Sequence, residues 1–316
     1  MTQRLFFWLK VLIAVILLAL IITTIRPRPI WEALLAAEYN LALCAALLMP
    51  VNIFLQERKW AYLVRLSHPD ATAGETWGSL LGGYTFGIVT PGRIGEYGRS
   101  LLIRNAEPLR LVGLTIIDKF YNLGLTTAVG LPALFTLPWA LHLATGYVLY
   151  SLLALMVVLD GFLLYLALDP RPVRSLIYAA QIMLPKGERV ARLMGGLDRF
   201  GKPQARRTLL FTLAHYSVFL IQYFLLINAL CPLDFLNSSR SAAAILFTKS
   251  AIPIAIGDLG LDQLVSVQFF GQFGVTSEAA FNASLLLFAI NVVIPALAGL
   301  LFVGRLPLGD RKRPES

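Results

Sequence analysis

Six apolar runs in this sequence are each long enough to cross a lipid bilayer as a helix, which takes about 20 residues. They are Leu5–Ile25, Tyr39–Gln56, Phe120–Leu137, Leu143–Leu166, Thr208–Leu230 and Ala279–Gly304. Charged residues make up only 14% of the chain, against roughly 25% in soluble domains. Because backbone groups in lipid must be satisfied within the segment, the sequence predicts an all-α polytopic membrane protein.

Charge placement predicts which ends of these runs face the cytoplasm. The segment Asp169–Arg207 carries nine basic residues and three acidic ones. Lys and Arg concentrate in cytoplasmic loops, so this segment is placed there, together with Arg4 and the basic tail 307–316. We expect a multi-pass protein of a bacterial or archaeal cytoplasmic membrane with both termini in the cytoplasm.

Two further segments, Thr76–Arg104 and Ser241–Ser277, each hold two partly apolar stretches around a Pro/Gly break. Counting spans from either side puts both ends of Thr76–Arg104 in the cytoplasm and both ends of Ser241–Ser277 outside. Neither segment is therefore a single crossing. Each is predicted to be a re-entrant hairpin or a pair of short crossings.

The same count divides the chain into two halves of opposite orientation. Residues 1–138 form a first repeat and residues 139–306 a second, each reading span, span, hairpin, span, with 307–316 as a tail. Inverted repeats of this kind are common in membrane transporters. The breaks share a Gly-charged-aliphatic-Gly pattern, and their predicted structural residues are Pro91, Gly92, Gly95, Pro253, Gly257 and Gly260.

The charged residues at the two breaks are the candidate binding residues. Arg93 and Arg99 match a phosphate through the planar guanidinium, with Glu96 orienting one of them; the alternative is that an arginine only pairs with Glu96 at the boundary. At the second break lie Lys249, Asp258 and Asp262. Charges at membrane depth are costly, so these form a stabilising Lys249–Asp258 pair, a polar path for a headgroup, or a proton-coupling carboxylate.

Several classes of site are not indicated. His68, His142 and His215 stand alone, the two cysteines lack metal spacing, and there is no glycine-rich phosphate loop, so we expect no metal and no cofactor. The net charge of +9 is accounted for by membrane topology rather than nucleic-acid binding. A homo-oligomer stays open.

One motif resembles a known family. Pro91-Gly92-Arg93-x-Gly95-Glu96-x-x-Arg99 is similar to a signature of the flippase-like transmembrane domain of lysylphosphatidylglycerol synthases and its stand-alone relatives. Arg58-Lys59-Trp60, Asp118-Lys119 and the late Pro253…Gly257-x-Leu259-Gly260 agree with it. The resemblance implies movement of a lipid or lipid-linked substrate between leaflets, with membrane lipids, anionic or polyprenyl-linked, as the expected partners. Because no aminoacyl-transferase domain follows, lysyl transfer is not implied.

The second loop departs from that family's pattern. Asp258 stands in place of its second glycine, Gln263 in place of its acid, and Asp262 is added. The leading hypothesis is a flippase-like translocase for an anionic or lipid-linked substrate. The alternatives are a membrane-embedded transferase or accessory subunit in polyprenyl-linked glycolipid or hopanoid synthesis, using Glu96, Asp118 or Asp258, and a proton-coupled small-solute transporter using Asp160 or Asp258.

Overall fold

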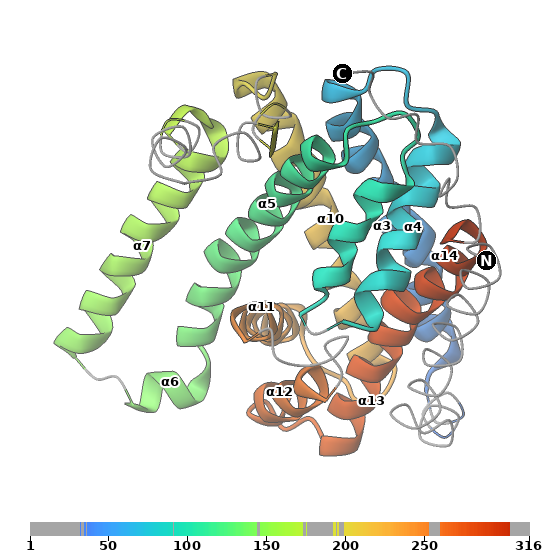
Figure 1. Ribbon diagram of the computed structural model, residues 1–316. Coiled ribbons are helices and arrows are strands. Elements are labelled where there is room, and N and C mark those ends of the chain that lie inside the picture. The colour runs from blue at the N-terminus through green and yellow to red at the C-terminus, as the bar shows by residue number, and fades with distance from the viewer. Residues whose placement is uncertain are drawn as a thin grey trace.

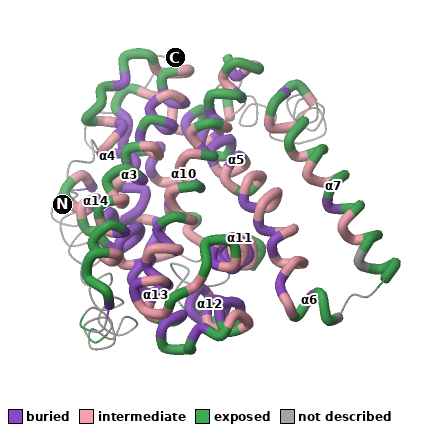
Figure 2. The backbone as a smooth tube through the Cα atoms, turned by 180° about the vertical axis from the view of Figure 1, so that it is seen from behind, coloured by how far each residue is buried: buried purple, intermediate pink, exposed green. Residues whose placement is uncertain are grey.

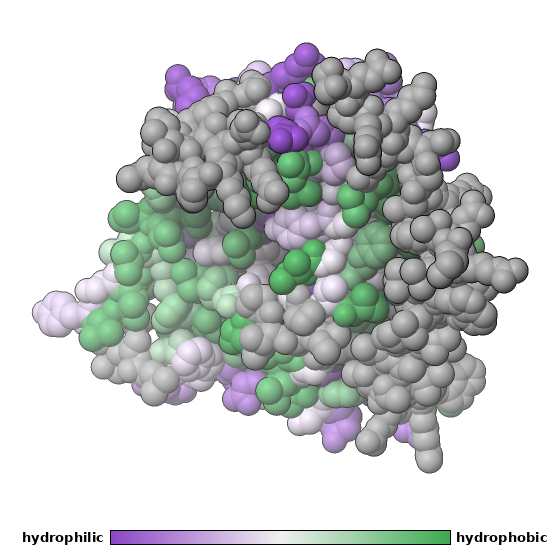
Figure 3. Space-filling model, viewed as in Figure 1, coloured by the Kyte–Doolittle hydropathy of each residue, from purple (hydrophilic) through white to green (hydrophobic). Residues whose placement is uncertain are grey.

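A computed structural model describes residues 37–90, 92–143, 146–172, 199–252 and 260–303, together with positions 32, 35, 175, 192, 193 and 195. The described part is helical and contains no strand. Figure 1 shows the helices as one bundle, with α7 at its margin. In the visible face of Figure 3, hydrophobic residues cover the region of α5 and α7, and hydrophilic residues gather at the upper and lower edges. This banding is that of a protein embedded in a membrane.

The described elements are distributed over the two predicted repeats as follows. The first half contains α3 (Tyr39–Ser67), α4 (Ala73–Ile88), the 3₁₀-helix η1 (Ile94–Leu102) and α5 (Pro108–Phe135). A short α6 (Pro138–Leu143) leads into α7 (Tyr147–Leu168). After the basic segment come α10 (Lys202–Asn228), α11 (Phe235–Ala251), α12 (Leu261–Gly271), α13 (Ser277–Phe288), the π-helical turn η2 (Ala289–Val293) and α14 (Ile294–Val303).

Four helical stretches among the described residues are long and apolar enough to cross a membrane. They are Tyr39–Ser67, Tyr150–Leu168, Lys202–Asn228 and Ser277–Val303, and each contains most of one predicted span. The predicted span Leu5–Ile25 lies outside the described residues. The predicted span Phe120–Leu137 lies mostly in α5, whose 28 residues extend about 42 Å, although Asp118 and Lys119 lower its apolar content.

The segment Thr76–Arg104 folds into a hairpin of α4 and η1. Residue rises of about 1.5 and 2.0 Å make the arms roughly 24 Å and 18 Å long, shorter than a hydrocarbon layer of about 30 Å. The chain reverses at Gly92 and Arg93, both with positive φ (56° and 55°). A side chain at Gly95 would collide with the Phe86 carbonyl oxygen, so glycine lets η1 lie closely against α4.

The segment Ser241–Ser277 contributes a second hairpin, α11 and α12, at the opposite end of the bundle (Figure 1). Asp234 caps α11 by accepting a hydrogen bond from the Asn237 amide, and Gly260, with a φ of 86°, begins α12. Pro253, Gly257 and Asp258 lie outside the described residues, as does Pro91 at the first break. In Figure 1 α11 is viewed nearly end-on, so it lies across the bundle rather than along it.

Helix packing is reciprocal between the halves. The two long helices α3 and α10 pack against each other at the centre. The first helix of each hairpin packs against the last long helix of the other half, with α4 on α14 and α11 on α5. Buried residues concentrate in this central set (Figure 2), whereas α7 is mostly exposed. The exposed face of α7 is apolar, with Val157 and Val158 about 70% accessible, as expected for contact with lipid.

A cluster of three buried amides lies where α3, α10 and η2 meet. Asn52 Nδ2 donates to Asn291 Oδ1 at 2.8 Å and to Gln222 Oε1 at 3.3 Å, and Asn291 Nδ2 donates to Gln222 at 3.0 Å. Pro50 in α3 and Pro295 in α14 each remove a helical hydrogen bond near this cluster. The central helices are therefore held together by polar contacts at the point where their own hydrogen-bond ladders are interrupted.

Candidate functional site

A cavity of about 570 Å³ lies between the two hairpins and the long helices α5 and α10. The first hairpin contributes Gly92, Arg93 and Glu96 to its wall, and the end of α11 contributes Lys249 and Ser250. The structure therefore brings residues from both predicted breaks to one cavity. The rest of the wall comes mainly from one stripe of α5 (Ile116, Lys119, Phe120, Asn122, Leu123, Thr126) and one of α10 (Thr212, His215, Tyr216, Phe219).

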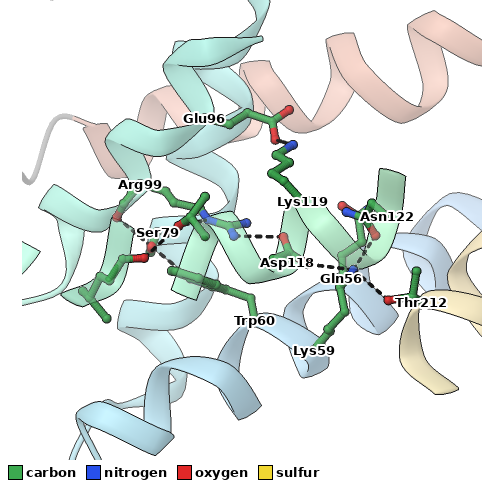
Figure 4. Close-up of polar contacts among 12 residues, drawn as sticks. Gln56, Lys59, Trp60, Ser79, Glu96, Arg99, Asp118, Lys119, Asn122 and Thr212 are labelled. Atoms are coloured by element: carbon green, nitrogen blue, oxygen red, sulfur yellow. Dashed lines mark hydrogen bonds and ion pairs between the residues drawn. The ribbon is translucent and has the colours of Figure 1, made fainter. Parts of the chain in front are cut away.

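The first cluster of charges lies on the cavity wall and joins η1 to α5. Arg93 Nη2 lies 2.6 Å from Glu96 Oε1, and the ammonium of Lys119 pairs with the other oxygen of the same carboxylate. The Arg93 guanidinium also lies over the ring of Tyr84, 5.1 Å from its centre. Two cations thus share one carboxylate beside the cavity, and Figure 4 shows Glu96 and Lys119 pointing toward each other.

The second cluster is more deeply buried than the first and joins α3, η1 and α5. Asp118 lies 2.7 Å from Lys59 Nζ and 2.9 Å from Arg99 Nη2, and all three side chains are buried. The Arg99 guanidinium stacks on the Trp60 ring at 3.6 Å from its centre, and Lys59 donates to the Asn122 carbonyl oxygen at 2.6 Å (Figure 4). As in the first cluster, one carboxylate forms ion pairs with two cations.

The structure places the predicted charged residues of the first break in two different surroundings. Arg93 and Glu96 line the cavity, and they pair with each other, as the alternative for these residues described. Arg99 does not line the cavity, because its guanidinium is held between Asp118 and Trp60. Gly92 and Gly95 form the turn and the close approach of the hairpin.

At the second hairpin, Lys249 lines the cavity and lies 3.0 Å from Asp262 of α12. The predicted Lys249–Asp258 pair involves a residue outside the described part of the chain. Gln263, which stands in place of a family acid, accepts a hydrogen bond from the Gly260 amide at 2.7 Å. It therefore caps the start of α12, a role that its amide oxygen can fill without a charge.

The structure adds residues that sequence reasoning did not assign to the site. Lys119 and Asn122 on α5, Gln56 on α3 and His215 on α10 all line the cavity. The sequence contains an indication for Lys119 and Asn122, because Asp118-Lys119 interrupts an apolar run and Asn122 follows Lys119 at helical spacing. His215 was treated as an isolated histidine; its place beside Thr212 and Lys119 follows only from the packing of α10 on its neighbours.

No group of three or more His, Cys, Asp or Glu side chains within the described ranges is arranged to hold a metal ion. What the described wall offers instead is positive charge and hydrogen-bond donors. Arg93, Lys119 and Lys249 reach it from three elements, while Glu96 is its one described acid. Such an arrangement favours an anionic group, because buried charge is stabilised by an opposite charge at close range.

Comparison with known proteins places this chain in a family. No curated protein sequence and no solved structure matches the chain. A family model described as the lysylphosphatidylglycerol synthase transmembrane region matches residues 7–299 of the 316-residue chain, a range that includes both hairpins, both charge clusters and every cavity-lining residue. The family and the apolar helices both support a membrane location, and the family indicates a relation to lipid handling. The chain therefore belongs to the family of lysylphosphatidylglycerol synthase transmembrane regions.

Proposed function

We propose that this protein is a flippase-like translocase that moves an anionic lipid or lipid-linked substrate between the leaflets of a cytoplasmic membrane. The observation that carries the proposal is the cavity itself. Two hairpins that approach from opposite ends of the bundle contribute residues to it, and each brings a cation, Arg93 or Lys249. A binding site with one movable wall toward each side of the membrane is the arrangement that alternating access needs.

The reciprocal packing of the helices supports an inverted repeat of residues 1–138 and 139–306. If α3 corresponds to α10 and α4 to α11, the contact of α4 with α14 has its counterpart in the contact of α11 with α5. The inclined α11 breaks the equivalence of the two hairpins. In an alternating-access cycle the halves adopt unlike conformations at any moment, so one conformation of such a protein is expected to be asymmetric.

Topology follows from the basic residues. Arg58 and Arg104 flank the first hairpin, which we place on the cytoplasmic side with both termini. The second hairpin then enters from the outer side. The headgroup occupies the cavity while its chains stay in the bilayer along the exposed apolar face of α5, where Ile116 and Leu123 are about half accessible.

The transferase alternative would need a carboxylate free to exchange a proton with the substrate. Glu96 and Asp118 are each held between two cations, an arrangement that fixes them as ion-pair acceptors. The described geometry therefore favours binding and movement of the substrate over acid–base chemistry on it.

The test is lipid translocation in proteoliposomes, followed by dithionite quenching of a fluorescent phosphatidylglycerol. We expect translocation above the protein-free rate, reduced at least tenfold by Arg93→Gln and by Lys249→Gln. Arg240→Gln is the matched control, because Arg240 is a cation of the same helix as Lys249 that does not line the cavity. Wild-type protein that is folded yet gives the protein-free rate for every anionic lipid tried refutes the proposal.

A further inference from the structure

The two charge clusters contain more cations than carboxylates. Glu96 is shared by Arg93 and Lys119, and Asp118 is shared by Lys59 and Arg99. Lys119 and Asp118 are consecutive residues of α5, so the clusters adjoin. Unbalanced charge inside a protein is costly unless an opposite charge is brought in. The described part of this region is therefore short of negative charge, and the cavity is the place at which an anion can reach it.

The carboxylate and side-chain amide oxygens that line the cavity are already engaged. The Asn122 carbonyl oxygen accepts from Lys59, the Gln56 carbonyl oxygen accepts from the Tyr84 hydroxyl at 2.8 Å, and Glu96 accepts from two cations. The Asn291 carbonyl oxygen accepts from Asn52. Donors, by contrast, remain available on the wall in the ammonium of Lys119, whose side chain is about a third exposed.

Phosphate and ammonium groups need opposite hydrogen-bonding partners on the cavity wall. A phosphate accepts hydrogen bonds only and matches lysine and arginine donors. An ammonium carries three N–H donors and no acceptor, so it needs free oxygens and negative charge. Asp262 lies beside the cavity-lining Lys249 and is already paired with it, 3.0 Å away. An amine entering the cavity would meet cations without gaining a free carboxylate or amide oxygen.

From this we infer that the site takes a phosphate headgroup whose substituent is uncharged, such as a polyol or sugar, and rejects headgroups that carry an amine. The inference rests on the proposed lipid translocation and narrows its substrate. It sets this chain apart from the lipid in its family's name, because a lysyl group adds amines to phosphatidylglycerol.

The experiment compares three fluorescent lipids with the same chains and label in the same proteoliposome preparation. They are phosphatidylglycerol, phosphatidylethanolamine and lysylphosphatidylglycerol. We expect phosphatidylglycerol to cross at least tenfold faster than either amine-bearing lipid. Equal or faster movement of lysylphosphatidylglycerol overturns the inference and leaves the proposed function standing. Movement of none of the three, nor of any other anionic lipid tried, with folded protein, is instead the failure of the proposed function.

A variant separates the charge argument from simple size selection. Lys119→Gln removes one cation from the wall and keeps a donor, so the preference for phosphatidylglycerol over phosphatidylethanolamine should shrink at least threefold. Arg240→Gln makes the same charge change away from the cavity and should leave the preference unchanged. An unaltered preference in Lys119→Gln, in protein with wild-type thermal stability, contradicts the electrostatic basis.

The phosphate could also come from a soluble compound, and one further arm distinguishes that source. Uptake of radiolabelled glycerol 3-phosphate into the same vesicles is measured beside lipid movement. We expect no uptake above protein-free vesicles. Uptake of glycerol 3-phosphate without movement of any lipid would show that the cavity serves a free phosphate compound, and would overturn the assignment to a lipid headgroup.

Discussion

Replacing Asp118 by asparagine tests whether the buried charge cluster is held together by this one carboxylate. Asparagine keeps the shape of the side chain and one acceptor oxygen, but it leaves Lys59 and Arg99 as two buried cations without their counter-ion. Removing one member of a buried ion pair costs about 3–5 kcal/mol. We expect a loss of that order in the free energy of unfolding, with the melting temperature lowered by roughly 10 °C.

The control for this prediction is Lys59→Met. It replaces the lysine by an uncharged side chain of similar volume. The Arg99–Asp118 pair, 2.9 Å apart, stays intact and is neutral overall. Because the cluster then has balanced charge, the expected cost is within about 1–2 kcal/mol, mainly from the lost bond to the Asn122 carbonyl. The double variant should be more stable than Asp118→Asn alone, since only one uncompensated cation remains.

The assay is thermal unfolding of the purified protein in detergent, with tryptophan fluorescence as the signal because Trp60 lies in the cluster. All three variants and the wild type are measured in one detergent. The reasoning is refuted if Asp118→Asn is no less stable than Lys59→Met, or if adding Lys59→Met to Asp118→Asn lowers stability further.

Three more predictions follow from described contacts. Gly95→Ala should cost about 1–3 kcal/mol because its Cβ would collide with the Phe86 carbonyl, whereas Gly124→Ala, which has open space in the α5 interior, should be neutral or stabilising by about 0.5–1 kcal/mol, both measured by thermal unfolding. Asn291→Leu leaves a buried amide unsatisfied and should cost about 1–3 kcal/mol by the same assay. Hydrogen bonds from Arg171 hold the pKa of Asp169 well below its usual range, so the wild type should be more stable than Asp169→Asn at neutral pH. This advantage should begin to decline as the pH falls below about 4 and be lost progressively at lower pH; a pH-independent difference contradicts it.

Much of the architecture followed from counting charges and spans. The count required Thr76–Arg104 and Ser241–Ser277 each to begin and end on the same side, and each segment contains two helices that pack against each other. Four predicted spans coincide with apolar helices. These features depend on composition over many residues, which is why the sequence alone was sufficient to predict them.

The individual contacts of the site were harder to predict. Arg93, Glu96 and Lys249 were expected at a binding site and do line the cavity, but the sequence gives no reason for Glu96 to choose Arg93 and Lys119 while Arg99 turns to Asp118. That choice depends on the left-handed conformation of Arg93 and on the 3₁₀ geometry of η1. Both are set by packing against α4 and α5, which residue types and spacing do not report.

Lys59 illustrates a second limit. Lys59 follows the end of the predicted span Tyr39–Gln56 by three residues, a place typical of a charge at the membrane boundary. The hydropathy pattern does not distinguish such a charge from a buried one. The structure shows α3 continuing to Ser67, so Lys59 lies within the helix with 2% of its side chain exposed. A charge inside the bundle is recognised only when its counter-ion, here Asp118, is known to lie beside it.

The central claim, that one cavity opens in turn to both sides of the membrane, is tested by cysteine accessibility at Ser250, an exposed residue of the cavity wall. Ser250→Cys is made in a background with Cys44 and Cys231 replaced by alanine, and a membrane-impermeant maleimide is applied to sealed vesicles of each orientation. Arg104→Cys and Tyr147→Cys serve as one-sided controls, each expected to react from a single and opposite face. The account predicts that the thiol at position 250 reacts from both faces. Reaction from one face only, with and without anionic lipid, contradicts alternating access through this cavity.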